Sequence, residues 1–354
     1  MTAPDAGGRV LSARDLNRAV LARQLLLGRA DLPLPRAVER MGLLQAQYAP
    51  SMYIGLWSRV ADFRRADLTA ALESRSLVQG TSLRATIHLT SAEDWWPAAL
   101  AVRRARRRWW LAARRGRPGA LEEVESAAAR VRDRLAGGPQ RRSVVQAELG
   151  LDAGLWNGVN LWLDLVRVPP SGTWERRSAD LHALAEAWIG PPPPGATEES
   201  GLALLLRRYL GAFGPAPLAD AATWAGVPPA TLKPVAADLD LRRFRDEAGT
   251  ELLDLADGPL PGGDTPAPVR FLPTWDAVLL VHARRARLLR EDDRPALFST
   301  KTPHSSPSFL VDGHVAGRWR HDGGRIVTEA FRPLSRTAAR AVAAEAEALV
   351  ELHR

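Results

Sequence analysis

The sequence contains no cysteine and only two lysines, Lys233 and Lys301. The absence of cysteine excludes disulfide bonds, thiolate-ligated zinc and iron–sulfur clusters, and it agrees with a reducing cytoplasm. The shortage of lysine leaves few candidates for Schiff-base chemistry, because that chemistry needs a nucleophilic amine. We therefore expect a cytoplasmic protein whose chemistry uses neither thiolates nor a covalent imine.

Long apolar runs are also missing. No stretch of about 18 apolar residues occurs, and the first ten residues have no apolar signal core, so we expect neither membrane spanning nor secretion. The chain has 354 residues, of which 46% are hydrophobic and 25% are charged. This composition is typical of a globular protein with two or three domains.

Several catalytic signatures are absent as well. The seven histidines are scattered, and no pair has the i,i+4 spacing that would place two zinc ligands on one helix face. There is no glycine-rich phosphate loop of the Walker type and no serine in a nucleophile-elbow setting. We therefore expect no metal and no cofactor, and nucleotide hydrolysis and acyl transfer are disfavoured.

Positive charge is concentrated in one segment. The formal net charge is +8, but residues 101–142 contain 13 arginines against four acidic residues, so this segment carries +9 and the remainder nets −1. A solvated helix face is one explanation. No acidic residue between 101 and 120 is available to pair with the arginines, which favours contact with nucleic-acid phosphates. The expected DNA contacts in this cluster are Arg103, Arg104, Arg107, Arg108, Arg114 and Arg115.

One order of elements recurs along the chain: helices followed by a β-hairpin. The first unit has predicted helices at 12–27, 35–48 and 67–74 before a β-rich segment at 80–89. The second has helices at 120–135, 143–149 and 154–165, then strands at 166–168 and 172–176, and a helix at 181–189. The third has a helix at 201–213, a helix-turn-helix at 218–239, and strands at 241–245 and 250–255. This order predicts a mainly α fold with small β-hairpins, built from three tandem winged helix-turn-helix units.

Proline- and glycine-rich segments at 190–195 and 259–268 mark the expected boundaries. A C-terminal α+β segment should contain a helix at 277–289, a hairpin at 307–319 around Asp312-Gly313, and a helix at 335–352. The predicted domains are 1–95, 96–190, 196–258 and 269–354.

Two glutamines, Gln45 and Gln47, flank Ala46 near the end of the second predicted helix. Burying two amides destabilises a protein unless each finds partners. They either cap local backbone or hold a water or a reacting sugar in a cleft, and their spacing leaves both explanations open. Arg84 and His88 should lie nearby if the unit packs normally, as support for such a site or as ordinary hydrogen-bonding residues.

Two further segments carry candidate residues. Asp276, after Trp275, is either a general base beside an aromatic wall or the cap of the helix that begins at Ala277. The polar loop at 298–307 carries Lys301, His304 and Ser305, which we expect to contact DNA, although loop tips are commonly polar without such a role.

Five stretches together resemble the winged-helix DNA glycosylases of the AlkZ and YcaQ type. They are Leu44-Gln45-Ala46-Gln47, the strand at 83–89, the helix-turn-helix at 218–239, and the segments 271–280 and 311–319. The resemblance spans nearly the whole chain, and it rests on the order and spacing of the motifs. It implies a C-shaped scaffold of three winged helices around a DNA channel, with Gln45 and Gln47 cleaving an N-glycosidic bond. It also implies that a C-terminal hairpin probes the lesion.

The Gln-x-Gln form of the motif resembles the AlkZ-like branch. That resemblance implies a bulky, cationic N7-alkylguanine substrate in double-stranded DNA, in repair or self-resistance, and we expect the protein to act as a monomer. Two amides can position a water and direct carbonyl dipoles at the sugar, which predicts a monofunctional glycosylase that leaves an abasic site. The alternative is a non-enzymatic winged-helix DNA-binding protein, either a regulator or a drug-sequestering factor.

Overall fold

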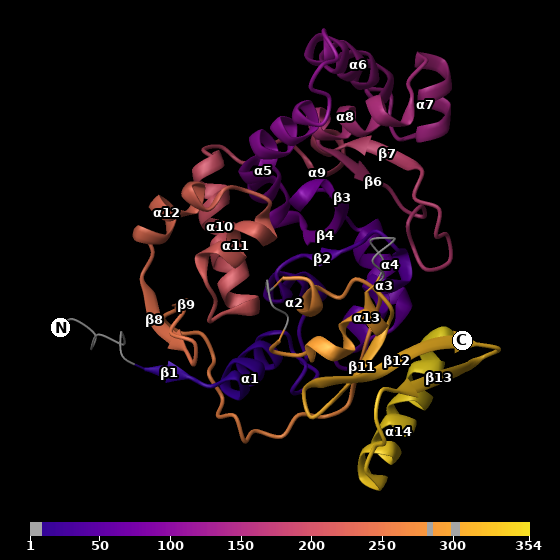
Figure 1. Cartoon of the computed structure of the whole chain (residues 1–354). Helices are drawn as coiled ribbons and strands as arrows, with labels where there is room; N and C mark the ends of the chain where they lie inside the picture. Colours follow the sequence, from indigo (N-terminus) through magenta and orange to yellow (C-terminus); the bar gives the residue numbers. More distant parts are fainter. Residues whose placement is uncertain (1–8, 282–285, 299–304) are drawn as a thin grey trace.

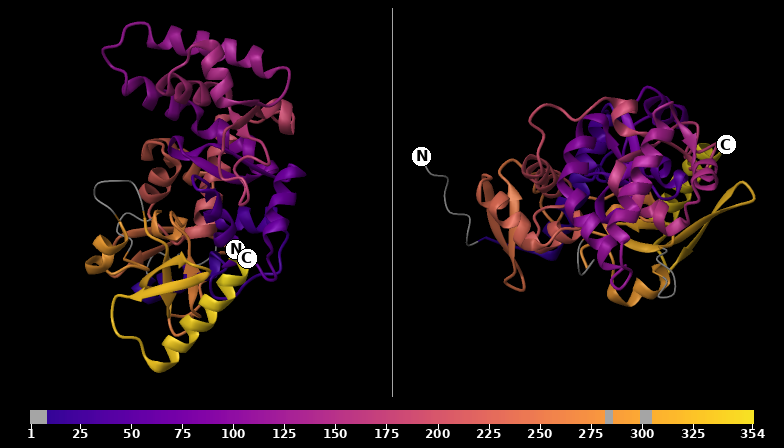
Figure 2. Two further views of the ribbon diagram at one scale, coloured as in Figure 1. Left: turned by 90° about the vertical axis from the view of Figure 1, so that its right-hand side faces the viewer. Right: turned by 90° about the horizontal axis from the view of Figure 1, so that it is seen from above.

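The computed structural model describes residues 9–281, 286–298 and 305–354, which form a curved arrangement of mixed helices and strands (Figures 1 and 2). Its N-terminal part contains β1 (Val10–Leu11), α1 (Ala13–Arg23), α2 (Leu34–Met41), β2 (Leu44–Gln45), α3 (Ala49–Trp57), α4 (Arg65–Glu73), β3 (Leu77–Thr81), the 3-10 turn η1 (Leu83–Ala85) and β4 (Ile87–Ser91). A capping box at Ser12 starts α1, as expected, because the Ser12 hydroxyl accepts the Asp15 amide.

The central part is mostly helical and joins the N-terminal part through one sheet. It contains α5 (Ala92–Ala112), α6 (Ala120–Leu135), β5 (Gln140–Arg141), α7 (Arg142–Leu149), α8 (Ala153–Leu163), β6 (Leu165–Arg167), β7 (Leu181–Leu184) and α9 (Ala185–Ile189). The strand order is β2-β4-β3-β6-β7-β5, so the two small hairpins expected from the sequence belong to a single six-stranded sheet. The expected boundary at 95/96 therefore separates two parts that share this sheet.

The second predicted hairpin needs a correction. The partner of β6 is β7 at 181–184, where a helix was predicted, and the predicted strand at 172–176 does not form. Instead, the amides of Gly172 and Thr173 both donate to the carbonyl of Arg176 and close a compact loop. Only the end of the predicted helix, α9, is helical.

The third part matches its predicted order of elements. It contains α10 (Glu198–Phe213), α11 (Leu218–Ala225), α12 (Pro229–Ala237), β8 (Leu241–Asp246) and β9 (Glu251–Leu255). The two short helices meet at Gly226, whose left-handed backbone (φ 76°) ends α11. β8 and β9 form an antiparallel hairpin, and β1 pairs with β8 in parallel, which ties the N-terminus to this part.

The C-terminal part is a four-stranded antiparallel sheet with one long helix. It contains β10 (Arg270–Leu272), η2 (Ala277–Leu279), η3 (Glu291–Asp293), α13 (Arg294–Leu297), β11 (Ser308–Val311), β12 (His314–Asp322), β13 (Arg325–Ala330) and α14 (Arg336–His353). The predicted helix at 277–289 is wrong in its described residues, because only the 3-10 turn η2 forms. The carbonyl of Leu288 accepts the amide of Val315 at 2.8 Å, so this segment is held by the hairpin.

The predicted hairpin around Asp312-Gly313 forms, but its turn lies against α1 (Figure 1). The carboxylate of Asp312 pairs with Arg14 at 2.9 Å and also with Arg18, and Asn17 donates to the carbonyl of Gly313 at 2.8 Å. This turn is therefore fixed within the protein and does not project freely, as a lesion-probing hairpin would. The hairpin of β12 and β13 is the one that extends outward, at the edge of Figure 1.

Helix α10 lies along α5 and shares the largest hydrophobic core with distant parts of the chain. That core includes Val20 of α1, Val102 of α5, Tyr209 of α10, Leu272 of β10 and Leu310 of β11. The parts predicted as separate units are thus fused through common buried surface. None of the helices in the described ranges is both long enough and apolar enough to cross a membrane.

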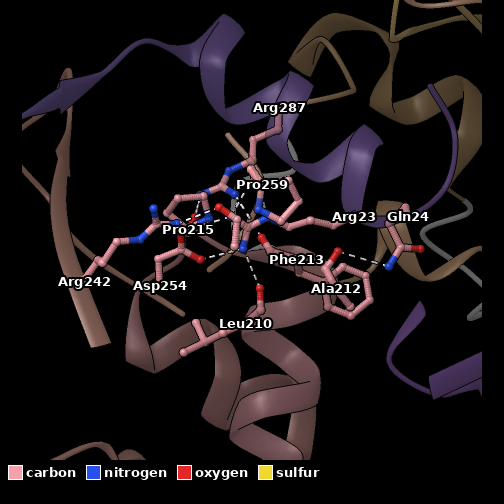
Figure 3. Close-up of polar contacts among 11 residues, drawn as sticks. Arg23, Gln24, Leu210, Ala212, Phe213, Pro215, Arg242, Asp254, Pro259 and Arg287 are labelled. Atoms are coloured by element: carbon pink, nitrogen blue, oxygen red, sulfur yellow. Dashed lines mark hydrogen bonds and ion pairs between the residues drawn. The ribbon is translucent and has the colours of Figure 1, made fainter. Parts of the chain in front are cut away.

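A buried polar cluster joins α1 to the third part (Figure 3). Arg23 pairs with Asp254 through both carboxylate oxygens, at 2.5 and 3.0 Å, and the two side chains are fully buried. Arg23 also donates to the carbonyls of Leu210 and Pro259, and Arg242 donates to Asp254 at 2.6 Å. We call this set the Arg23–Asp254 cluster; it fixes α1 against α10 and β9.

Candidate active site

The glutamine motif lies on a short strand rather than in the helix predicted for it. α2 ends at Met41 because Gly42 and Leu43 both adopt left-handed backbone, with φ of 75° and 62°. The chain then reverses, and β2 pairs antiparallel with β4, which places Gln45 opposite His88. Residues opposite each other on neighbouring strands share one face of the sheet. The helical prediction failed because the turn at Gly42 interrupts it.

The two glutamine side chains bond to each other. Nε2 of Gln45 donates to Oε1 of Gln47 at 3.0 Å. Gln45 is half-buried and Gln47 is exposed, so the expectation of two buried amides was wrong. Among the described residues, Oε1 of Gln45 and Nε2 of Gln47 have no protein partner. An acceptor and a donor therefore remain free at one place on the surface.

The two glutamines line two different cavities. The larger, of about 270 Å³, is lined by Gln47 and by residues of the central part such as Trp109, Arg142 and Arg167. The smaller, of about 20 Å³, is lined by Gln45 together with Asp276 and other residues of the N- and C-terminal parts. The glutamine pair thus lies where three parts of the chain meet.

Asp276 is buried beside the smaller cavity and makes two structural contacts. Its Oδ1 pairs with Arg59 at 2.8 Å, and it accepts the amide of Val278, which caps η2 as one prediction required. Gly55 also holds Arg59, through a 3.0 Å bond to its carbonyl. Asp276 therefore shares a cavity with Gln45, with its negative charge balanced by a buried guanidinium.

His88 is buried and neutral. Burial, together with the nearby positive charge of Arg84, lowers the pKa of His88 to about 3. Its Nδ1 lies 3.1 Å from the carbonyl of Thr86, which can only accept, so Nδ1 carries the proton and Nε2 is left as an acceptor. Arg84 donates to the carbonyl of Trp224, and burial lowers its pKa. Arg84 and Ala85 both have left-handed backbone, with φ of 52° and 56°, so η1 is strained beside the motif.

Half of the arginines predicted to bind DNA, which lie in α5 and just after its end, are occupied within the protein. Arg103 pairs with Asp164 at 2.5 Å, Arg107 donates to the carbonyls of Leu161 and Trp162, and Arg114 lies 3.7 Å over the ring of Trp110. The expectation that no acidic partner exists was wrong, because Asp164 is distant in sequence and adjacent in space. Arg104, Arg108 and Arg115 are exposed, with no side-chain partner among the described residues.

The polar loop is only partly described. Lys301 and His304 lie outside the described residues. Ser305 is buried, its carbonyl accepts the Thr274 hydroxyl, and its own hydroxyl accepts the amide of Trp275 at 2.7 Å. The hydroxyl expected to contact DNA is therefore engaged in holding the turn before Asp276.

Sequence reasoning overlooked Arg142 and Arg167, which line the larger cavity. Arg167 stands between Val166 and Val168 in β6, and Nη1 of Arg167 donates to the carbonyl of Ala46 at 3.3 Å. An arginine within an apolar strand was the available signal, because such a residue has to have a partner or a task. Nothing in the sequence indicated that it would reach the residue between the two glutamines.

Comparisons with known proteins agree on one family. The model of the AlkZ-like DNA glycosylase family matches residues 38–352. Among solved structures, that of the Streptomyces sahachiroi DNA glycosylase AlkZ is similar with a TM-score of 0.81 at 20% identity, over 97% of each chain. A comparison with curated protein sequences gave no match. The paired glutamines therefore stand in a chain that belongs to the AlkZ-like DNA glycosylase family and is a DNA glycosylase.

Proposed function

We propose that this glycosylase hydrolyses the N-glycosidic bond of bulky, cationic N7-alkylguanine in double-stranded DNA, with Gln45 and Gln47 as its catalytic residues. The observation that carries the proposal is the mutual bond of the two amides, which leaves one acceptor and one donor free beside a cavity. The free amide oxygen can accept a hydrogen bond from a water molecule, and the free amide nitrogen can donate one to the oxygen of the same water. Such a water is positioned for attack on the anomeric carbon.

The neutral amides suit a base that is already positively charged. Alkylation at N7 makes guanine a good leaving group, so departure of the base needs no strong acid. The free carbonyl of Gln45 can stabilise the developing positive charge on the sugar. The water oxygen bonds to the anomeric carbon as the bond to the base breaks, and the electron pair of that bond neutralises the base. The water loses one proton to solvent, because a neutral amide does not accept it, and the products are a free base and an abasic site.

Three further groups, of which His88 and Asp276 are buried, can support the glutamines. His88 lies opposite Gln45 in the sheet and stays neutral, so it adds no positive charge that would oppose a cationic sugar. Asp276 borders the cavity beside Gln45, where its carboxylate can favour that cation from a distance. Arg84 holds η1 against Trp224 of the third part. We assign them supporting roles.

The proposed complex places duplex DNA across three winged-helix units. Arg104 and Arg108 of α5 and Arg115 shortly after its end are the best placed of the predicted phosphate contacts, because they are exposed and have no side-chain partner in the described part of the chain. The role would be repair of, or self-resistance to, a DNA-alkylating compound by a cytoplasmic, nucleoid-associated monomer. Lys301 and His304 remain proposed contacts.

Base release tests the assignment directly. A duplex with one N7-alkylguanine is incubated with the wild type and with the variants Gln45→Ala and Gln47→Ala, and alkali-sensitive sites are measured in single turnover. Each variant should be slower by about 10²–10³-fold, as when one oriented donor is removed from an active site. Gln140→Ala, in β5, is the matched control and should keep the wild-type rate. Base release that neither variant slows would overturn the proposed roles.

The charge of the base provides a second test. A 7-deaza-7-alkylguanine has the same shape without the positive charge, so it should bind with similar affinity and be released far more slowly. Binding of both duplexes with no base release from either would favour the non-enzymatic alternative for this chain.

A further inference from the structure

We propose that Arg142 and Arg167 bind one backbone phosphate of the DNA strand that carries the lesion, in the larger cavity beside Gln47. The inference rests on the proposed function, because it takes the ligand to be the duplex that the glutamine pair acts on. The cavity of about 270 Å³ is near the lower end of the range for ligand sites, about 300 Å³. It has room for a phosphate and part of the attached sugar.

Positive charge in this cavity is uncompensated. Its lining contains two arginines and no aspartate or glutamate. Neither Arg142 nor Arg167 forms an ion pair with any residue that the structure describes. By contrast, Arg103 and Arg106 of α5 share the carboxylate of Asp164. Charges withdrawn from water are normally paired in proteins, so two half-buried guanidinium groups at one cavity, without an ion pair among the described residues, indicate an anionic ligand.

Arg167 is the more deeply placed of the two. Its Nε is buried and has no partner, while Nη1 makes only a 3.3 Å bond to the carbonyl of Ala46. Burial and the charge of Arg142 lower the pKa of Arg167 to about 10. A phosphate in the cavity would accept from the free donors and offset both charges.

Arg142 is oriented by its surroundings but keeps its terminal nitrogens free. Nε donates to Oε1 of Gln146 at 2.7 Å, and the guanidinium lies 5.8 Å from the ring centre of Trp156. His182, on the same wall, adds no charge, because burial lowers its pKa to about 4. The two arginines are therefore the cations of the cavity, and the neighbouring ring and amide hold one of them in place.

Arg167 also connects this cavity to the glutamine motif. Its bond to the carbonyl of Ala46 reaches the residue between Gln45 and Gln47, and Gln47 itself lines the cavity. A phosphate on Arg167 would fix the strand relative to the amide pair. Arg167 is thus a positioning residue, which acts on the reaction through the backbone of the motif.

Removing single phosphate charges tests the proposal with the wild-type protein. A set of duplexes carries one neutral methylphosphonate at successive positions on either side of an N7-alkylguanine. Affinity and single-turnover base release should fall by about tenfold or more at one position in the lesion strand, because a hydrogen bond to a charged group is lost. A uniform response across all positions, or none, would overturn the proposal.

Variants of the two arginines then test whether these residues bind the phosphate at that position. Arg167→Gln and Arg142→Gln should each bind the unsubstituted duplex more weakly, and the salt dependence of binding should fall by an amount that corresponds to about one phosphate contact. A methylphosphonate at the position found with the wild type should no longer weaken binding to these variants. Arg340→Gln, on the exposed face of α14 at the opposite end of the molecule, should keep the wild-type pattern (Figure 1). Variants that retain the sensitivity would overturn the assignment.

The binding measurement keeps this inference separate from the proposed function. If the wild type releases no base but still loses affinity at one methylphosphonate, the phosphate site stands and the catalytic assignment fails. If base release is normal and no position matters, the phosphate site fails alone. Should Arg167→Gln not fold, Arg142→Gln and the wild-type scan decide the question.

Discussion

Two polar clusters in this protein are satisfied to different degrees. In the Arg23–Asp254 cluster, the buried carboxylate receives the buried Arg23 and the half-buried Arg242, and Arg23 also reaches two backbone carbonyls (Figure 3). Beside the glutamine motif, the amides of Gln45 and Gln47 bond only to each other, and Nε of Arg167 has no partner. The first cluster is closed in charge, and Nε of Arg242 is its one buried side-chain nitrogen without a partner among the described residues. The second has a free amide acceptor and donor and a guanidinium with no ion pair in the described part of the chain.

This difference separates residues that hold the fold from residues that await a ligand. A buried polar network stabilises a unique structure only when every member is bonded, and an unfilled position is destabilising. The free groups near the motif come from β2, β6 and α7, whereas the closed cluster comes from α1 and the third part. The completeness of bonding is therefore a better guide to function here than the density of charge, since the arginine-rich α5 is partly closed by Asp164.

The closed cluster should give the largest effect on stability. Asp254→Ala leaves Arg23 buried without a counter-charge, and we expect the free energy of unfolding to fall by about 3–5 kcal/mol. Urea denaturation of the wild type and the variant measures this change. Base release per folded molecule should not change, because the cluster lies away from the glutamines. Asp257→Ala, at an exposed position nearby, should shift the unfolding free energy by less than about 0.5 kcal/mol.

Gly42 connects the stability of the fold to the open site, and its substitution should have an intermediate effect. An added Cβ would meet Cβ of Ala212 at 2.8 Å and the Arg208 carbonyl at 3.2 Å, on backbone already left-handed. We expect Gly42→Ala to lower the free energy of unfolding by about 1–3 kcal/mol and to slow base release, because Gln45 follows three residues later. Both are measured on one preparation.

Gly116→Ala separates backbone strain from close packing in that experiment. Gly116 is also left-handed, with φ of 92°, but nothing lies within 4 Å of its added Cβ. It should show the smaller destabilisation and normal base release. Equal effects from the two substitutions would mean that the contact with α10 does not position the motif.

The features that short sequence patterns determine could be predicted from the sequence. Capping at Ser12, the Gly226 turn and the Asp312-Gly313 hairpin follow from residue types at short range, and the structure confirms each. The paired glutamines were identified as candidates, but their helix was wrong, because the left-handed Gly42 ends α2 and the local helix-ending signal of this glycine was overlooked.

Features that depend on distant partners were not predictable. Asp164 binds two arginines of α5, and Arg167 of β6 reaches the backbone of Ala46. Neither contact has a local signature, since each joins residues brought together only by the six-stranded sheet and the helices packed on it. The sequence could therefore indicate which residues were chemically unusual but not which of them had already found a partner.

His88 gives the smallest effect at neutral pH, where its substitution should change stability least, and its pH dependence tests whether the open site keeps a neutral imidazole. The pKa of His88 is about 3 in the folded protein against 6.5 for an unperturbed histidine, so between these values the unfolded chain binds a proton that the folded chain does not. Stability contributed by the neutral ring is present above pH 6.5 and is lost as the pH falls towards 3.

His88→Gln should make the free energy of unfolding depend less steeply on pH in this window, by at most about 1.4 kcal/mol per pH unit. Urea midpoints between pH 4 and 7 measure the slope, and NMR titration of the His88 ring in Arg84→Met should show a raised pKa, because a nearby positive charge is gone. An unchanged slope in His88→Gln would show that folding does not lower the pKa of His88, and the neutral support proposed for Gln45 would then fail below pH 6.5. An unchanged ring pKa in Arg84→Met would show only that Arg84 does not contribute to the shift.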